Sequence, residues 1–178
     1  DLESAHAIAR INPAEQDLLT CTQKPIVLLD KKDPFPLADD VAPGISLVGI
    51  MLPYTPLHHL LMRTISLDAL VMTSANLAEE PIVTDNQETY RKLSAIAECY
   101  LSHNREILTP NDDSVQRVLD DLPVFIRRSR SYAPAPILLT MDSGRTLAVG
   151  GGLKNTICFS KGKEYYLSQH IGDLVHLE

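Results

Sequence analysis

The 178-residue sequence has no tryptophan and only six tyrosines and three phenylalanines, so its core must be mostly aliphatic. Its cysteines, Cys21, Cys99 and Cys158, are far apart and form no C-x-x-C pair. A disulfide framework or a zinc site is therefore not expected. We expect free thiols in a reducing cytoplasm. No apolar run approaches the roughly 20 residues that cross a bilayer. The N-terminus has neither a signal-peptide pattern nor an initiating methionine, and we expect a piece of a longer, cytoplasmic protein without a membrane partner.

The sequence also lacks an excess of basic residues, since its formal net charge is −7. A nucleic-acid partner is therefore not expected. Arg127, Arg128 and Arg130 form the one dense basic patch, which by itself is typical of a solvated strand end. The G-x-x-x-x-G-K-[ST] and strand-linked G-x-G-x-x-G motifs are missing too, which excludes the standard phosphate loops.

Periodicity and turn residues indicate an α/β fold. Asn12 is a predicted N-cap, with Pro13 at the first helical position and Glu15 in the first turn. The stretch SVQRVLD and the stretch PVFIRRS are predicted as two strands joined by a turn at D-L-P, and residues 146–172 as a β-meander with a turn at K-G-K. The further helices are predicted at residues 12–20, 57–65 and 86–103, and the further strands at residues 25–31, 45–52 and 68–74.

Two segments about a hundred residues apart carry polar groups at predicted strand ends. The first runs from MLPYTPLHHLL to LVMTSANLAEEPIV and contains Ser74 and Asn76, whose hydroxyl and carboxamide could donate to phosphate or carboxylate oxygens. Taken alone, T-S-A-N is more typical of a turn or a helix cap. The second runs from LAVGGGLKNTICF to YLSQHIGDL and places Lys154 and Asn155 after three glycines. Taken alone, it is more typical of a hairpin without a ligand.

Together these motifs resemble the HypF family, the carbamoyltransferases that mature [NiFe]-hydrogenases. The order of strand, MLPYTP, helix and TSAN resembles a YrdC-like adenylating domain, whose S-x-N motif is matched by Ser74 and Asn76. That family's later hydroxyl-bearing strand is matched at Ser114 and its final-strand arginine at Arg127. The LKNT and LSQHIGD segments, the latter with His170 and Asp173, resemble the opening of an actin-like ATPase domain. There the resemblance implies nucleotide contacts at Lys154 and Asn155.

The resemblance implies a YrdC-like twisted mixed sheet with helices, followed by the first hairpin or meander of an actin-like fold. The expected domains are residues 1–136 and 146–178, with a linker at 137–145. The family's K-x-R motif does not occur before Ser74, so the N-terminal part of the first domain is expected to lie outside this chain. Ser131 stands where the family commonly has glycine, which bears on the backbone conformation there.

The implied activity uses carbamoyl phosphate and ATP with Mg²⁺ to form a carbamoyl-adenylate. The carbamoyl group would then pass to the C-terminal cysteine of a partner protein, HypE. Zinc is expected only in domains outside this chain. The alternatives are a YrdC-type threonylcarbamoyl-AMP synthase of tRNA modification, against which LKNT and LSQHIGD argue, and an inactive nucleotide-binding fragment.

Two pairs of adjacent residues, one of histidines and one of aspartates, are candidates for a metal site. His58 and His59 are adjacent on a predicted helix and point about 100° apart, so both cannot easily hold one ion, although one can face a cleft. Asp112 and Asp113 are adjacent in a predicted turn, where carboxylates are usually solvated or capping. No metal site and no catalytic residue is therefore predicted from the sequence.

Overall fold

The computed structural model describes residues 1–78, 80–152 and 154–171. The chain divides into two compact units, each of which is described by itself. Unit 1 consists of Asp1–Met72 and Asp113–Tyr132, and unit 2 of Thr73–Asp112 and Ala133–Glu178. Gly172, the last residue of the predicted meander, and Asp173, of the LSQHIGD segment, lie outside the described residues. No helix within the described residues is long and apolar enough to span a bilayer.

The sheet of unit 1 is built around strand β2 (Ile26–Lys31). Strand β3 (Leu47–Ile50) pairs antiparallel with β2, whereas β4 (Val115–Leu119) pairs parallel with it, with Ile26 opposite Val115. The short β1 (Ala9–Arg10) pairs antiparallel with the other end of β2. The sheet is thus mixed, as the resemblance implies. Its topology gathers the starts of β2 and β4 and the end of β3 at one edge.

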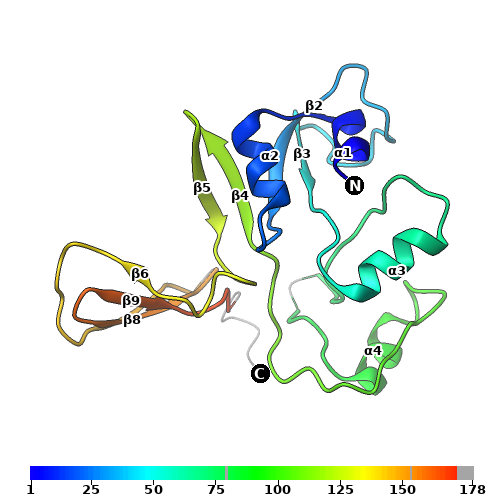
Figure 1. The fold of residues 1–178 in the computed structure, drawn as a ribbon. Helices are drawn as coiled ribbons and strands as arrows, with labels where there is room; N and C mark the ends of the chain where they lie inside the picture. The colour runs from blue at the N-terminus through cyan, green and yellow to red at the C-terminus, as the bar shows by residue number, and fades with distance from the viewer. Residues whose placement is uncertain (79, 153, 172–178) are drawn as a thin grey trace. The chain divides into compact units, whose positions relative to one another are not determined.

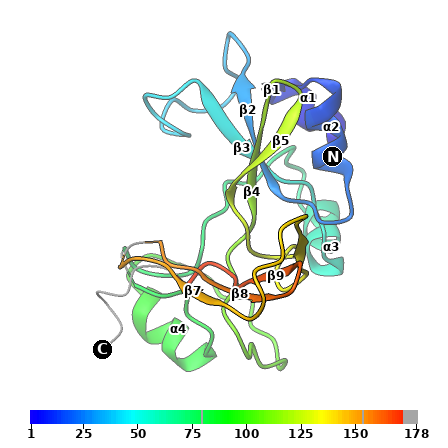
Figure 2. The same ribbon diagram turned by 90° about the vertical axis from the view of Figure 1, so that its left-hand side faces the viewer.

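Strands β4 and β5 (Leu122–Arg127) form the predicted hairpin (Figure 2). Its turn is Asp120–Asp121, with φ of 49° and 60°, and not the predicted D-L-P. A two-residue hairpin turn of this kind requires positive φ at both positions, which aspartate tolerates better than most residues. The hairpin brings the end of β5 back to the start of β4, and so to the same edge of the sheet.

Helices of unit 1 begin at identifiable caps. Helix α2 (Pro13–Thr20) has the expected start, since Asn12 and Glu15 form a reciprocal capping box. Helix α3 (Pro56–Thr64) begins where the Thr55 hydroxyl accepts a hydrogen bond from the His58 amide. Helix α1 (Leu2–Ile8), which the sequence analysis did not predict, is capped by Asp1.

The core of unit 1 lies between the helices and the sheet. Helix α2 packs on β2 and the hairpin, and α1 on α2 and β1 (Figures 1 and 2). Leu19, Val27 and Leu29 have no solvent exposure. The remaining members are small or aliphatic, as the scarcity of aromatic residues requires: Ala5, Ile8, Ala9, Val48 and Leu52.

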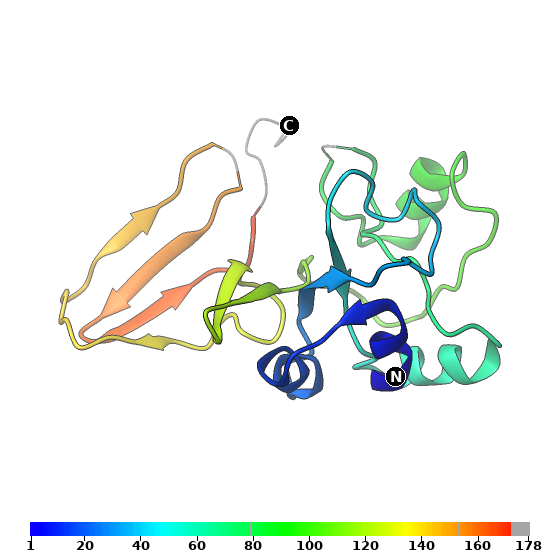
Figure 3. The ribbon, with the colours of Figure 1, turned by 90° about the horizontal axis from the view of Figure 1, so that it is seen from above.

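The described residues of unit 2 form an antiparallel sheet and one helix. Its strands are β6 (Ile137–Leu138), β7 (Leu147–Val149), β8 (Ile157–Lys161) and β9 (Glu164–Leu167). Their order is β6-β9-β8-β7, and β7, β8 and β9 form the predicted meander (Figure 3). Helix α4 (Asn86–Leu93) begins at its N-cap Asp85.

Two predicted elements are wrong. Residues 68–74 form no strand, because no neighbouring strand among the described residues pairs with them, and Val71 is 80% exposed. The helix predicted over residues 86–103 ends at Leu93, and residues 97–103 are irregular. The apolar positions of this segment are only partly covered, since Leu93 is buried whereas Ile96 is 68% exposed. The rings of Tyr90 and Tyr100 meet edge to face with centroids 4.9 Å apart.

Candidate functional site

Ser74 and Asn76 lie in unit 2, in the turn that follows residues 68–73. The Ser74 hydroxyl donates to the Asn76 carboxamide oxygen. The Asn76 Nδ2 in turn donates to the backbone oxygens of Leu77 and Glu80, at 2.8 and 3.0 Å. Asn76 therefore holds the turn together, while the exposed Ser74 keeps acceptor capacity on its hydroxyl oxygen.

Ser114 is fully buried at the start of β4 in unit 1. Its hydroxyl donates to the Arg130 carbonyl at 2.9 Å and accepts from the Ser129 amide at 2.8 Å. These bonds fasten the chain just after β5 to the start of β4. The hydroxyl predicted to contact a ligand is thus engaged with the backbone of its own unit.

Arg127 is the last residue of β5 and lies opposite Val115 in the register of the hairpin. It is half-buried. Of the predicted adenylation residues, the structure therefore brings Ser114 and Arg127 together in unit 1. It brings Ser74 and Asn76 together in unit 2.

Arg130 is the centre of a polar cluster that the sequence analysis missed. Its side chain is only 15% exposed, so the solvated-strand-end interpretation is wrong for this residue. Its Nε pairs with the Asp113 carboxylate, and its Nη2 donates to the Lys24 carbonyl at 2.7 Å. The guanidinium also lies 3.6 Å from the centre of the Tyr54 ring. The remaining contacts are Gln23 O and Ser131 Oγ, each at 3.0 Å, and Met51 Sδ at 3.6 Å.

These contacts use all five donors of a guanidinium. Arg130 therefore ties together the entry to β2, the exit from β3 and the entry to β4. A lysine, with one ammonium group and no planar fork, could not make the same set of contacts. No short-range pattern signals this role, because the partners are distant in sequence.

The cluster extends through Tyr54 to His58. The two rings meet edge to face, with centroids 4.7 Å apart. Burial raises the pKa of the Tyr54 hydroxyl, and the nearby Asp113 carboxylate adds to the rise while Arg130 opposes it. Burial lowers the pKa of the His58 imidazole, against a smaller opposing effect of Asp113. His58 is therefore mainly neutral at pH 7.

A second polar network surrounds Tyr132. Its hydroxyl accepts from Gln116 Nε2 at 2.7 Å, its carbonyl accepts from Arg128 Nη2 at 2.8 Å, and its ring meets Phe125 edge to face. Burial is the main cause of the raised pKa of the Tyr132 hydroxyl, and of the lowered pKa of Arg128. The network holds the chain where it leaves unit 1.

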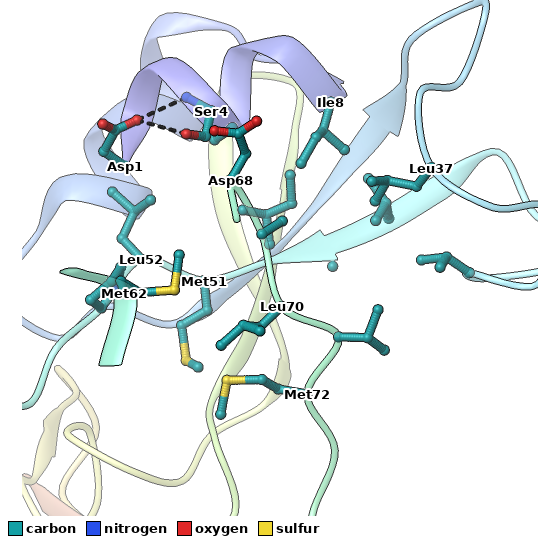
Figure 4. Close-up of a pocket in the computed structure, with 18 of the residues that line it drawn as sticks. Asp1, Ser4, Ile8, Leu37, Met51, Leu52, Met62, Asp68, Leu70 and Met72 are labelled. Atoms are coloured by element: carbon teal, nitrogen blue, oxygen red, sulfur yellow. Dashed lines mark hydrogen bonds between the residues drawn. The ribbon is translucent and has the colours of Figure 1, made fainter. Parts of the chain in front are cut away.

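Unit 1 contains a cavity of about 500 Å³ next to the first cluster (Figure 4). Its walls are β3 and the residues that follow it, one face of α3, part of α1 and the extended segment 68–72. Met51, Met62 and Met72 line it, together with His58. The expectation that one of the two adjacent histidines faces a cleft is thus met by His58, whereas His59 is exposed.

The turn between β7 and β8 in unit 2 contains Lys154 and Asn155. Lys154 has a φ of 49°, in the left-handed region. Asn155 is only 6% exposed, and its Oδ1 is buried with no hydrogen-bond partner among the described residues. A Cβ on Gly150 would clash with this oxygen and lie 3.0 Å from the Thr156 carbonyl oxygen, so a larger residue there would force the turn to shift. Asn155 thus packs against the glycine-rich strand end.

Ser131 has a φ of 68°, a conformation that glycine adopts without strain. The residue that replaces the commonly observed glycine therefore stands in the left-handed region. Among the described residues, no group of three or more His, Cys, Asp or Glu could hold a metal ion.

Comparison with known proteins matches two family models to consecutive parts of the chain. Residues 1–129 match the Sua5/YciO/YrdC model, described as "Telomere recombination". Residues 141–178 match the model of the HypF Kae1-like domain.

Similar curated proteins are carbamoyltransferases named HypF. The one from Rhizobium leguminosarum bv. viciae is 45% identical over all of this chain and 24% of its own length. The one from Synechocystis sp. is 46% identical over 92% of this chain and 21% of its own length. The chain thus spans about a quarter of these relatives.

Solved structures of HypF have a similar fold. A crystal structure of full-length HypF in its phosphate- and nucleotide-bound form aligns at 44% identity with a TM-score of 0.87, over 98% of this chain and 28% of that chain. HypF from T. kodakarensis aligns at 39% identity with a TM-score of 0.90, over 100% of this chain and 23% of that chain.

Proposed function

Because the chain belongs to the Sua5/YciO/YrdC family and is homologous to a segment of HypF carbamoyltransferases, we propose that it works as part of an ATP-dependent carbamoyltransferase of [NiFe]-hydrogenase maturation. Water hydrolyses carbamoyl phosphate to carbamate, and inorganic phosphate leaves. A carbamate oxygen then attacks the α-phosphorus of ATP, and pyrophosphate leaves as carbamoyl-adenylate forms. The carbamoyl group passes to the C-terminal cysteine thiol of HypE, and AMP is released.

One observation carries this proposal: the two family matches follow each other in one chain. A Sua5/YciO/YrdC match at residues 1–129 is compatible with several adenylating enzymes, but the HypF Kae1-like match at residues 141–178 is specific to one of them. We accordingly assign residues 1–136 to the adenylation domain and 146–178 to the start of the carbamoyl-transfer domain, with 137–145 as a linker.

The proposed roles of the site residues follow from their surroundings. Arg127, half-buried at the end of β5, contacts phosphate oxygens, and Ser74 contributes its exposed hydroxyl oxygen. Asn76 and Ser114 have structural roles, since the polar atoms of Asn76 hold a turn of unit 2 and those of Ser114 hold a strand end of unit 1. In the second domain Lys154 contacts nucleotide phosphates, and Asn155 supports the turn that presents it.

Mg²⁺ is proposed to enter with ATP. The described residues offer no cluster of three or more ligands, and Mg²⁺ bound to nucleotides usually takes most of its ligands from phosphate and water. When bound, the ion would neutralise charge on the phosphates. Asp113 does not fit as a ligand, because its carboxylate pairs with Arg130.

The reaction is proposed to take place in the cytoplasm. The three cysteines are all free, which suits a reducing compartment.

The test is ATP–pyrophosphate exchange by the full-length enzyme. Exchange that depends on carbamoyl phosphate is expected, because adenylate formation is reversible. An Arg127→Gln variant should lose most of this exchange, whereas Arg117→Gln, on the neighbouring strand, should retain it. Exchange that requires threonine and bicarbonate would instead favour the threonylcarbamoyl-AMP synthase alternative.

A further inference from the structure

The turn that carries Ser74 has no regular secondary structure to fix its position. Residues 73–78 and 80–84 form neither helix nor strand. One backbone hydrogen bond closes the turn, from the Val83 amide to the Ala75 carbonyl oxygen at 2.9 Å. A bond within the turn sets its shape, but it does not attach the turn to another element of unit 2.

Lys92, on helix α4, makes that attachment. Its Nζ lies 2.8 Å from a carboxylate oxygen of Glu80 and 3.0 Å from one of Glu88. Glu80 belongs to the turn, and its backbone oxygen accepts a hydrogen bond from Asn76 Nδ2 at 3.0 Å. Glu88 lies on α4 itself, four residues before Lys92. The ammonium therefore joins the turn to the helix through one of its two ion pairs.

Helix α4 is held at both ends. The Asp85 carboxylate caps its start, and the side-chain amide of Asn86 donates to the carbonyl oxygen of His103 at 3.0 Å. Its last residue, Leu93, is only 8% exposed. Lys92 therefore stands on a helix that offers the turn a fixed point.

The pair of Lys92 and Glu80 acts on geometry more than on stability. The two side chains are 28% and 38% exposed, and ion pairs this accessible to water contribute little to the free energy of unfolding. The hydrogen bond to Glu80, followed by that to Glu88, raises the pKa of the Lys92 ammonium, which is therefore charged at pH 7. A charged group held by two carboxylates restricts the Glu80 side chain, and with it the turn.

We propose that Lys92 is a positioning residue, which through Glu80 holds the turn so that the Ser74 hydroxyl oxygen stays where adenylation uses it. The inference rests on the proposed function, because it concerns a residue to which that function gives a role. Lys92 touches neither the substrates nor the reacting atoms. Small displacements of a group that contacts substrate lower the rate, so a residue that only positions such a group still affects catalysis.

The first test follows the turn itself and needs no activity. In the full-length enzyme, we expect Lys92→Met to raise amide hydrogen exchange in residues 73–84 about fivefold, the most that a partly exposed ion pair contributes. Methionine keeps an unbranched side chain but has no charge. Glu88→Gln is the matched control, because it removes the other partner of the same ammonium and leaves the pair with Glu80. It should change exchange there by less than about 1.5-fold. Equal exchange in Lys92→Met and the wild type would overturn the inference.

The second test is kinetic. We expect Lys92→Met to lower kcat/KM for ATP in pyrophosphate exchange about fivefold, and Lys92→Arg, which keeps the charge, to stay within about twofold of the wild type. Arg91→Met, at a neighbour whose side chain is 77% exposed, should have no effect. In a Ser74→Ala background, Lys92→Met should cost less than about twofold, since the hydroxyl that it positions is gone. A further fivefold loss in that background would overturn the inference. So would full activity in Glu80→Gln beside a loss in Lys92→Met, because Lys92 would then act without Glu80.

Failure of the proposed function gives a different result. If the wild-type enzyme catalyses no pyrophosphate exchange with carbamoyl phosphate, that function is refuted, while hydrogen exchange still decides whether Lys92 positions the turn. If the wild type is active and Lys92→Met keeps its kcat/KM, the proposed function stands and the inference is overturned.

Discussion

Replacing Ser114 by alanine separates a structural role of its hydroxyl from a role in binding nucleotide. The hydroxyl is buried and joins two backbone groups, the Ser129 amide and the Arg130 carbonyl. Alanine removes both bonds at once. A buried polar group that loses its partner costs about 1–3 kcal/mol. Ser129 is fully buried, so leaving its amide without a partner should cost a value in the upper half of that range. Arg130 is partly exposed, so leaving its carbonyl without a partner should cost a value near the lower end.

We therefore expect Ser114→Ala to lower the free energy of unfolding by about 3–4 kcal/mol. The chain has no tryptophan, so urea unfolding is best followed by far-UV circular dichroism. Ser102→Ala is the matched control, because Ser102 is exposed in an irregular segment. Its free energy of unfolding should change by less than about 0.5 kcal/mol.

The refuting result would be a Ser114→Ala protein of unchanged stability with a raised KM for ATP in the full-length enzyme. The hydroxyl would then serve the nucleotide and not the backbone. A loss of stability equal to that of Ser102→Ala would likewise contradict the burial and hydrogen bonds on which the estimate depends.

Three further changes test other parts of the structure. Ser131→Gly should stabilise the protein by about 0.5–1 kcal/mol in urea unfolding, because glycine is unstrained at a φ of 68°; Ser131→Ala, which loses the same hydroxyl but keeps the strain, should not. Gly150→Ala should disrupt the β7–β8 turn, since its Cβ would clash with Asn155 Oδ1, whereas a Cβ on Gly151 would meet nothing within 4 Å. Amide hydrogen exchange in β7 and β8 should rise for Gly150→Ala alone, and equal exchange in the two variants would refute the crowding. Because the pKa of His58 is lowered in the folded protein, the imidazole is protonated first in the unfolded chain as pH falls through about 6.5. The contribution of neutral His58 to the free energy of unfolding is therefore present above that pH and declines below it. The pH dependence of urea unfolding between pH 7.5 and 5 should be shallower in His58→Phe, and identical profiles would contradict the assignment.

Much of the local structure could be predicted from the sequence, because its signals act over a few residues. The capping box at Asn12 and Glu15 starts α2, and the turn at Gly162 separates β8 from β9, where φ is 65°. The family commonly has glycine where this chain has Ser131, which indicated an unusual backbone conformation there. Ser131 has a positive φ, as glycine commonly does. The motifs around Ser74 and Asn155 also indicate the family, and the matches to the two family models confirm it.

Other predictions failed where pairing or packing decides the outcome. Residues 68–74 have the composition of a strand, but a strand exists only beside a partner, and they have none among the described residues. The helix that begins at Asn86 stops at Leu93, because the apolar stripe beyond it has no core to cover. The periodicity of apolar residues in a sequence does not show whether other residues pack against the apolar face of the predicted helix.

The sequence by itself determined the family, the capping box at Asn12 and Glu15 and the pairing of neighbouring strands into hairpins, since each depends on neighbouring residues or on a motif. Only the tertiary structure showed which contacts the candidate site residues make within the chain. Arg130 looked solvated, yet it binds the carbonyls of residues 107 and 106 positions away, Gln23 and Lys24. Ser114 looked like a ligand donor, yet it is buried against the chain after β5. Such contacts depend on which strand ends the sheet topology brings to one edge, and no local pattern encodes that.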